Sequence, residues 1–324
     1  MESKHSPSGY HLNKKRLIGG EGGWDYLVVD DAARRLYVTH NDRVHVLNAD
    51  TLDPVGEVLK TEGVHGVAIA SDFRRGFASN GRASTVSIFD LGTLKVIKEV
   101  AVGRNPDAIR FDPFSKRVFV FNGLSHDASV IDAATGEVIA TIPLGGKPEF
   151  SVADGLGHVY VNNEDTSEVM VIDSKTLEVL SRWPIAPGES PTGLALDLKN
   201  RRLFSVCRNK FMIVLDADDG HVVASLPIGG GCDGCMFDPD RKLVFSSNGE
   251  GTLTIVREES PTTFSVLDTV DTKRGARTMT IDLRTHALFL PAADYGPTPQ
   301  PTVEQPKPRP PILPNTFVIL QFQK

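Results

Sequence analysis

A unit of four short runs recurs along the whole chain and constrains its fold more than any other feature. The first run is apolar and usually ends in Asp, as in "WDYLVVD", "PDAIRFD" and "CDGCMFD". A polar turn leads to a second apolar run, and a third and a more polar fourth run complete the unit. Equivalent positions in the first runs lie 40 to 44 residues apart: Asp25, His65, Asp107, Glu149, Thr192, Asp233 and Arg277. Repeats of this length, built from strand-sized runs, predict stacked four-stranded units.

Seven such units predict an all-β fold, a seven-bladed β-propeller with four-stranded antiparallel blades. We expect a single propeller domain over residues 1–324, with a flexible N-terminus at 1–10. The last unit ends at "TFVILQFQK" without a fourth run. The segment "HLNKKRLIGG" precedes the first unit as fourth runs precede the later units, so we expect this N-terminal strand to complete blade seven. Closure of this kind hides sheet edges that would otherwise be exposed.

The second runs "YVTH", "YVNN" and "VFVFN", together with the third runs and "G..P" turns, resemble YVTN-repeat β-propellers over essentially the whole chain. The resemblance implies the propeller fold and a relation to lactonase-like propellers. It also implies a periplasmic or extracellular location, since relatives include periplasmic and surface-layer proteins. The N-terminus lacks the apolar core of a signal peptide, so a cytoplasmic location is the alternative. A shared fold does not fix a function.

Charge and hydropathy exclude some partners. The formal net charge is −6 and the pI is about 5.9, whereas nucleic acids and anionic membranes attract basic surfaces. No run of 18 apolar residues occurs, so we expect no membrane span. We expect a monomer that binds a small molecule or a peptide.

Propeller geometry selects one face as the binding face. The first strand of a blade lines the central channel, and its start opens on the same face as the end of the second strand. The first column of residues is the series of seven equivalent positions, which carries four carboxylates. The second column is His40, Asn80, Asn122, Asn163, Cys207, Asn248 and Ala292. From these columns and a neighbouring tryptophan we predict the ligand-binding residues Trp24, Asp25, His40, His65, Asn80, Asp107, Asn122, Glu149, Asn163, Asp233, Asn248 and Arg277.

Both columns also have structural interpretations. Carboxylates at strand starts cap backbone N–H groups, and Arg277 would then pair with Asp233 or Asp25. Asparagine in a turn bonds its own backbone. The functional alternative is a site for a cation or a cationic ligand, because carboxylates crowded in a channel raise one another's pKa unless a cation compensates.

Three residues are the candidates for acid–base catalysis. His40 and His65 fall in neighbouring blades and form the best imidazole pair, and Glu149 is the candidate carboxylate. The remaining histidines fall on outer strands or turns, where we expect them at the surface: His45, His126, His158, His221 and His286.

The three cysteines fall in two adjacent units. Cys207, Cys232 and Cys235 could form a thiolate site for zinc or copper(I), a redox pair, a buried structural set, or a disulfide between Cys207 and Cys232. Strand alternation would direct Cys232 away from Asp233 and Cys235.

Residues 294–315 form a proline-rich insertion in blade seven, with eight prolines among 22 residues. Such a segment favours extended polyproline II structure. On the mouth face it would be a lid, a partner-docking arm or a plain surface insertion, with Tyr295, Lys307 and Arg309 as its groups able to reach a ligand.

Three function classes follow. The first is a non-catalytic scaffold that holds a small ligand, cation or peptide at the mouth. The second is a hydrolase or isomerase of the lactonase type, with a divalent metal ion held by carboxylate and amide oxygens. The third is a thiolate metal-binding protein. The sequence leaves open whether the protein is an enzyme.

Overall fold

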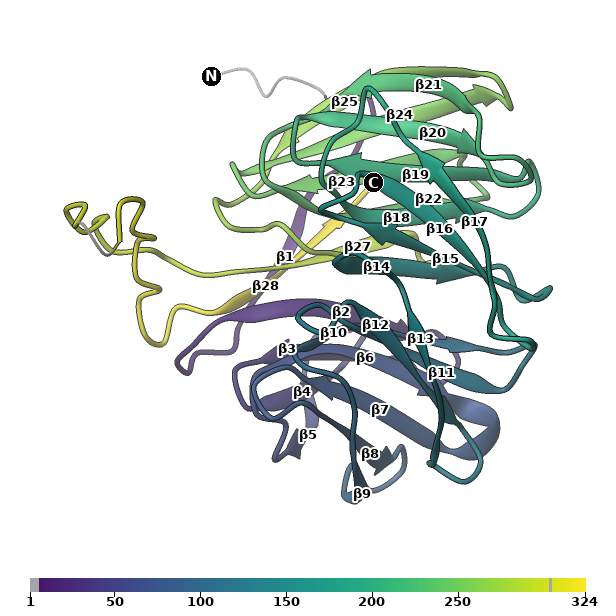
Figure 1. Ribbon diagram of the computed structural model, residues 1–324. Coiled ribbons are helices and arrows are strands. Elements are labelled where there is room, and N and C mark those ends of the chain that lie inside the picture. The colour runs from purple at the N-terminus through teal and green to yellow at the C-terminus, as the bar shows by residue number, and fades with distance from the viewer. Residues whose placement is uncertain (1–5, 303–304) are drawn as a thin grey trace.

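The computed structural model describes residues 6–302 and 305–324 and consists of seven four-stranded antiparallel sheets arranged around a central axis (Figure 1). The predicted fold class, an all-β seven-bladed propeller, is confirmed. The one helical segment in the described residues is the 3-10 turn η1 (Ser71–Phe73). Within those residues, no helix has the length and apolar character needed to span a membrane.

Each blade presents its strands in order from the channel outward. The innermost strands are β2 (Trp24–Asp30), β6 (Val64–Ala70), β10 (Pro106–Asp112), β14 (Pro148–Ala153), β18 (Pro191–Asp197), β22 (Cys232–Asp238) and β26 (Thr280–Asp282). The second strands are β3 (Arg35–His40), β7 (Arg75–Asn80), β11 (Arg117–Asn122), β15 (His158–Asn163), β19 (Arg202–Cys207), β23 (Leu243–Asn248) and β27 (Ala287–Ala292).

The outer half of each blade is equally regular. The third strands are β4 (Arg43–Asn48), β8 (Thr85–Asp90), β12 (Asp127–Asp132), β16 (Glu168–Asp173), β20 (Phe211–Asp216), β24 (Thr252–Ser260) and β28 (Val318–Gln323). The fourth strands are β5 (Pro54–Leu59), β9 (Val96–Ala101), β13 (Val138–Pro143), β17 (Val179–Pro184), β21 (Val222–Pro227), β25 (Thr263–Asp271) and, from the N-terminus, β1 (His11–Leu17).

The N-terminal strand closes the ring, as predicted. β1 pairs antiparallel with β28, with His11 opposite Gln323 and Leu17 opposite Val318. The stretch 1–10 was expected to be flexible, and its first five residues lie outside the described part. Within 6–10, Tyr10 is fully buried and Ser8 is 1% exposed. This end of the described chain therefore packs against the last two blades.

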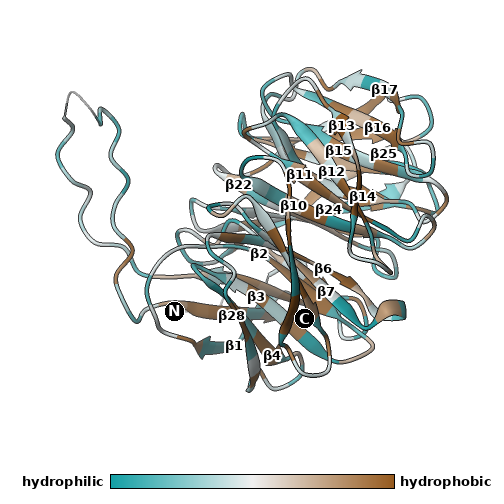
Figure 2. Cartoon of the chain, turned by 60° about the horizontal axis from the view of Figure 1, so that its bottom comes forward, coloured by the Kyte–Doolittle hydropathy of each residue, from teal (hydrophilic) through white to brown (hydrophobic). Residues whose placement is uncertain are grey.

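The hydrophobic core is divided among the seven boundaries between blades. One buried cluster lies at each boundary, from the blade one–two cluster to the one that joins blades seven and one. Figure 2 shows apolar strands and more polar turns throughout the ring. Because strand side chains alternate between two faces, each blade can bury residues against both neighbours.

The recurring aspartates are turn caps. The Asp132 carboxylate accepts hydrogen bonds from the backbone N–H groups of Ala134 and Thr135 at 3.0 and 2.8 Å. On the innermost strands, Asp112 does the same for Phe114 and Ser115. Aspartate favours such turns because its side chain replaces a backbone acceptor two residues away.

Candidate functional site

Hydroxyl groups on second strands hold the starts of the innermost strands in register. Ser79 Oγ donates to the Asp107 carbonyl of the next blade at 2.6 Å, and Ser247 Oγ donates to the Arg277 carbonyl at 2.5 Å. At the closure the link comes instead from Thr278, just before the innermost strand β26, whose hydroxyl donates to the Asp25 carbonyl at 2.7 Å. These bonds link consecutive blades next to the channel and fix the backbone from which the first column projects.

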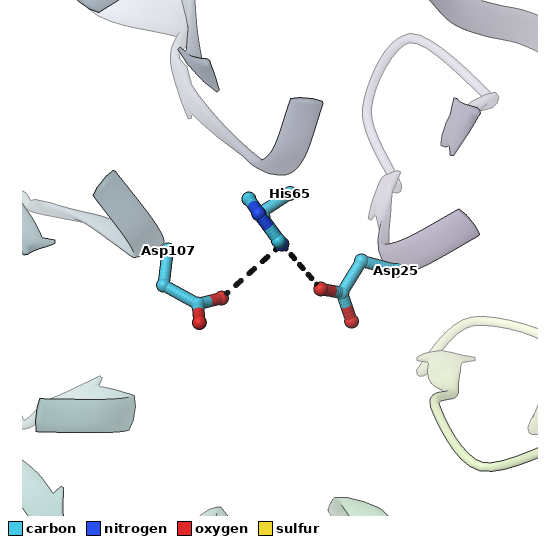
Figure 3. A group of neighbouring side chains, drawn as sticks. All are labelled: Asp25, His65 and Asp107. Atoms are coloured by element: carbon cyan, nitrogen blue, oxygen red, sulfur yellow. Dashed lines mark hydrogen bonds and ion pairs between the residues drawn. The ribbon is translucent and has the colours of Figure 1, made fainter. Parts of the chain in front are cut away.

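Asp25, His65 and Asp107 meet at the channel mouth (Figure 3). His65 Nδ1 lies 2.6 Å from Asp25 Oδ2 and 3.6 Å from Asp107 Oδ1. Burial lowers the pKa of His65, but the hydrogen bond to Asp25 and the two carboxylate charges outweigh it and raise the pKa to about 9. His65 is therefore an imidazolium at neutral pH. Ligand atoms of the three side chains lie within 4.8 Å of one another, a spacing that could also hold a cation.

Arg277 pairs with two carboxylates of the column and shares one of them, Asp25, with His65. Its Nε lies 2.9 Å from Asp233 Oδ2 and one terminal nitrogen lies 3.5 Å from Asp25 Oδ1. The same terminal nitrogen donates to the Trp24 carbonyl at 3.0 Å. The pairing of Arg277 with Asp233 and Asp25, expected if the column has a structural role, is therefore present. Burial nevertheless keeps the pKa of Asp233 raised, against the lowering charge of Arg277.

Glu149 belongs to a second charged group across the mouth. Lys147 Nζ lies 2.5 Å from Glu149 Oε1 and also contacts Glu164. Glu164 in turn lies 2.8 Å from Arg208 Nε. Burial, then the charge of Asp107, raises the pKa of Glu149 well above its usual value.

Most of these charged side chains line a cavity of about 420 Å³ on the mouth face. The residues that line it are Asp25, Tyr26, Asp107, Lys147, Glu149, Arg208, Gly231, Cys232, Asp233, Arg277 and Arg309. Asp107 is 8% exposed, and burial raises its pKa to about 7. Its Oδ1 is buried and has no hydrogen-bond partner among the described residues.

Tyr26 closes the floor of this cavity. It projects from blade one across the channel, where its ring centroid lies 5.0 Å from that of Phe150 in blade four. Its hydroxyl donates to Glu149 Oε2 at 3.4 Å. Tyr26 also lines a second cavity further along the channel, so its side chain separates a polar mouth from the rest of the channel.

Two predicted site residues lie elsewhere. His40 is 3% exposed and stacks on Phe317 at 4.1 Å. Its Nδ1 faces His45 Nε2 at 3.2 Å, so the predicted His40–His65 pair is wrong, and His45 is half-buried rather than a surface residue. Trp24 is also a core residue, 4% exposed and packed on Phe317. It reaches only the edge of the mouth.

The asparagine column faces into the blades rather than into the channel. Asn80 Nδ2 donates to Thr85 and Ser87 on the neighbouring strand at 3.1 and 2.8 Å. Corresponding bonds to third-strand side chains are made by Asn122, Asn163 and Asn248. All four are fully buried, and none lines the mouth cavity. The prediction that these asparagines bind a ligand at the mouth is therefore wrong.

The cysteines are free, buried thiols. Cys232 Sγ donates to the Cys207 carbonyl at 3.1 Å, and Thr192 Oγ1 donates to the Cys232 carbonyl at 3.0 Å, so Thr192 also turns away from the channel. Burial raises the pKa of Cys207 and Cys232 to about 12, and that of Cys235 well above its usual value. The disulfide alternative is wrong, and protonated thiols are poor metal ligands.

The base of the insertion packs beside the mouth. Tyr295 forms an isolated antiparallel bridge with Ile312 and lies under Arg274, whose guanidinium carbon is 5.5 Å from the ring centroid. Arg309 lines the mouth cavity, whereas Lys307 is exposed. Figure 1 shows the rest of the described insertion, in yellow, extending away from the ring. The insertion therefore forms an arm beside the opening of the channel.

Sequence reasoning missed the side chains of Tyr26, Lys147 and Arg208, which line the cavity, and of Glu164, which pairs with Lys147 and Arg208. Glu164 and Arg208 directly follow the second-column residues Asn163 and Cys207. β15 ends at Asn163 and β19 ends at Cys207, so Glu164 and Arg208 are the first turn residues at the mouth end of their blades. That one-residue offset is the signal that could have identified them.

A closed ring of seven sheets with a charged pocket at one mouth defines a β-propeller with a polar mouth site. In sequence, residues 18–154 match a family model described as a YNCE-like beta-propeller. This match and the seven-bladed ring confirm the resemblance to YVTN-type propellers predicted from the repeats. None of the curated proteins matches the chain.

Solved structures with the same fold include U3-55K and the WD40 repeats of RRP9. The first is 10% identical, with a TM-score of 0.77 over 96% of this chain and 98% of that chain. The second is also 10% identical, with a TM-score of 0.76 over 97% of each chain. At this identity the likeness shows the propeller fold alone.

Proposed function

We propose that this propeller is a binding scaffold whose channel mouth takes the cationic group of a small molecule or peptide. The observation that carries the proposal is the Asp107 carboxylate, which is buried in the mouth cavity and leaves Oδ1 without a hydrogen bond in the described structure. A buried polar atom without a partner costs free energy. A bound ammonium or guanidinium group would supply the missing donor.

The charge pattern of the mouth supports the same ligand class. The cations Arg277 and Lys147 already have carboxylate partners at 2.9 and 2.5 Å. Asp107 has only His65, and that imidazolium lies closer to Asp25. The carboxylate left for a ligand is thus Asp107, and charge-assisted hydrogen bonds to it would be among the stronger polar contacts.

Calorimetric titration with a matched series tests this function. The probes are N-acetyl-lysine amide, N-acetyl-arginine amide and the neutral N-acetyl-norleucine amide. We expect the wild type to bind a cationic probe in preference to the neutral one. Asp107→Asn removes the charge at nearly constant volume and should weaken cationic binding about tenfold or more, since charged hydrogen bonds contribute roughly 1.5–3 kcal/mol.

The control is Asp53→Asn, which removes a carboxylate from an exposed ion pair with Arg16 outside the cavity. It should bind the probes as the wild type does. Equal binding of lysine and norleucine amides, or unchanged binding by Asp107→Asn, would contradict the proposed function.

A second candidate function, metal-assisted hydrolysis of a lactone or ester, is favoured by the close approach of the Asp25, His65 and Asp107 ligand atoms. Oxygen-rich sites of this kind suit hard divalent cations. A metal ion would bind His65 only in its neutral form, so it would have to displace the proton that Asp25 and Asp107 favour. Calcium or manganese in the purified protein, with turnover of a lactone panel, would support this function over simple binding.

A further inference from the structure

The channel holds a second cavity on the side of Tyr26 away from the mouth. Its volume is about 430 Å³, within the range of small-molecule sites. The innermost strands line it mainly with apolar side chains, among them Ile109, Phe111, Phe150, Leu196, Met236 and Phe237. Its outer residues belong to the turns between first and second strands, so it opens on the face opposite the mouth.

A single charged side chain enters this apolar cavity. Arg110, from β10, is the one charged group among the described residues that line it. Its Nε and one terminal nitrogen donate to the Ser151 carbonyl at 3.1 and 2.7 Å, and its guanidinium carbon lies 5.3 Å from the Phe150 ring centroid. Burial lowers its pKa to about 10, and it remains a cation at neutral pH.

No carboxylate of the described residues forms an ion pair with Arg110, although Lys147 and Arg277 at the mouth are paired. Arg277 at the mouth, for comparison, has two carboxylate partners. The second terminal nitrogen of Arg110 makes no hydrogen bond within the described structure. Arg110 is half-buried, and a partly desolvated cation without a counter-ion can gain a charge-assisted hydrogen bond from an anionic ligand.

The entrance to the cavity is also apolar. Leu198 and Leu283 line the cavity and remain 48% and 41% exposed. The same two leucines line an adjoining groove of about 360 Å³ with Phe237 and Pro239. Large apolar side chains that stay exposed around a concave site are typical of ligand entrances.

We propose that this cavity binds a small amphipathic carboxylate, with its carboxylate on Arg110 and its hydrocarbon part along the apolar walls. The free donors of the guanidinium can take both oxygens of a carboxylate, the geometry in which arginine binds most strongly. The site is independent of the mouth, because Tyr26 and Phe150 lie between the two cavities.

The test compares octanoate, below its micelle concentration, with the neutral 1-octanol by calorimetric titration of the full chain. We expect octanoate to bind one site on the wild type. Arg110→Met should weaken octanoate binding about tenfold or more and leave octanol binding unchanged or stronger. This variant should fold, since it removes an unpaired, partly desolvated charge and keeps an apolar side chain against Phe150; its thermal unfolding is measured alongside.

A second variant leaves the interior untouched. Leu198→Glu places a negative charge at the exposed entrance and should weaken octanoate binding while sparing octanol. Asp107→Asn at the mouth should leave both probes unaffected, which separates this site from the proposed mouth function. Equal losses for octanoate and octanol in Arg110→Met, or no octanoate binding by the wild type at millimolar concentration, would overturn the proposal.

Discussion

His40 shows how one residue type changes the chemistry of a repeated position. Four other blades place asparagine there. In three of them the amide donates to a hydroxyl on the third strand, as Asn80 does to Ser87, whereas Asn163 donates to the Glu168 carboxylate. In blade one the third-strand partner is His45, which lies opposite Val38 as Ser87 lies opposite Ala78. A buried and a half-buried imidazole thus replace an amide–hydroxyl pair, and imidazoles titrate in a pH range where an amide does not.

We predict that the His40–His45 pair makes the fold acid-sensitive. Burial, followed by the charge of His45, lowers the pKa of His40 to about 4. The folded protein then binds fewer protons than the unfolded chain, so stability from this group is present above pH 6.5 and is lost as the pH falls toward 4. The loss is on the order of 3 kcal/mol.

The double variant His40→Asn with His45→Ser restores the pair found in blade two. Its free energy of unfolding, measured by denaturant titration between pH 7 and pH 4.5, should fall less steeply than that of the wild type. The comparison concerns the slope, because the smaller side chains also lower stability at every pH. Parallel curves for the two proteins would contradict the prediction.

At the scale of elements, the sequence could predict the strands but not the direction of every mouth side chain. The strands follow from alternating apolar residues and the Asp-capped turns, and all seven units appear where the repeats place them. However, most innermost strands shift register near the column, as between Trp24 and Leu27 in β2 and between Cys232 and Gly234 in β22. A bulge breaks the two-residue alternation, so orientation beyond it cannot be counted from the sequence.

The N-terminal strand β1 is mostly exposed, and we predict that Tyr10 anchors it. The Tyr10 ring is fully buried between blades six and seven, in edge contact with Phe245 at 5.1 Å. Its hydroxyl donates to the His286 carbonyl at 3.0 Å and accepts a bond from Arg241 at 2.9 Å. Tyr10→Ala should lower the free energy of unfolding by about 3 to 5 kcal/mol, as for other buried aromatic residues.

The matched variant Tyr10→Phe keeps the ring and removes only the hydroxyl. It should cost about 1 kcal/mol, and chemical denaturation measures both variants. Similar small losses for the two substitutions would show that β1 stays attached without this anchor.

For the whole molecule, ring symmetry explains both what could be predicted and what could not. Seven similar units must bring their first strands to one axis, so the mouth and most of its carboxylates follow from the repeat. Tyr26 reaches from blade one to Phe150 in blade four, a contact between residues 124 positions apart that no repeat pattern encodes. The division of the channel into a polar and an apolar cavity depends on that one crossing.

The last prediction concerns how the ring is closed. The two ends of the described chain lie together, with the Lys324 side chain about 3.0 Å from where a Cβ of Gly9 would stand. A short glycine–serine linker can therefore join Lys324 to Gly9, and new ends can be opened on either side of β21. Ends between Asp218 and Asp219 leave β21 as an N-terminal strand that pairs back onto β20, as β1 does onto β28. Ends between Gly229 and Gly230 leave every blade continuous and close the ring by side-chain packing alone.

We expect the first permutant to be the more stable by about 2 kcal/mol or more, since opening its ring must also break strand hydrogen bonds. The two proteins have the same composition and linker, and only the position of one strand relative to the chain ends differs. Denaturant unfolding of both, followed by tryptophan fluorescence, measures the difference. Equal midpoints and slopes would mean that packing between blades closes this propeller without help from a shared sheet.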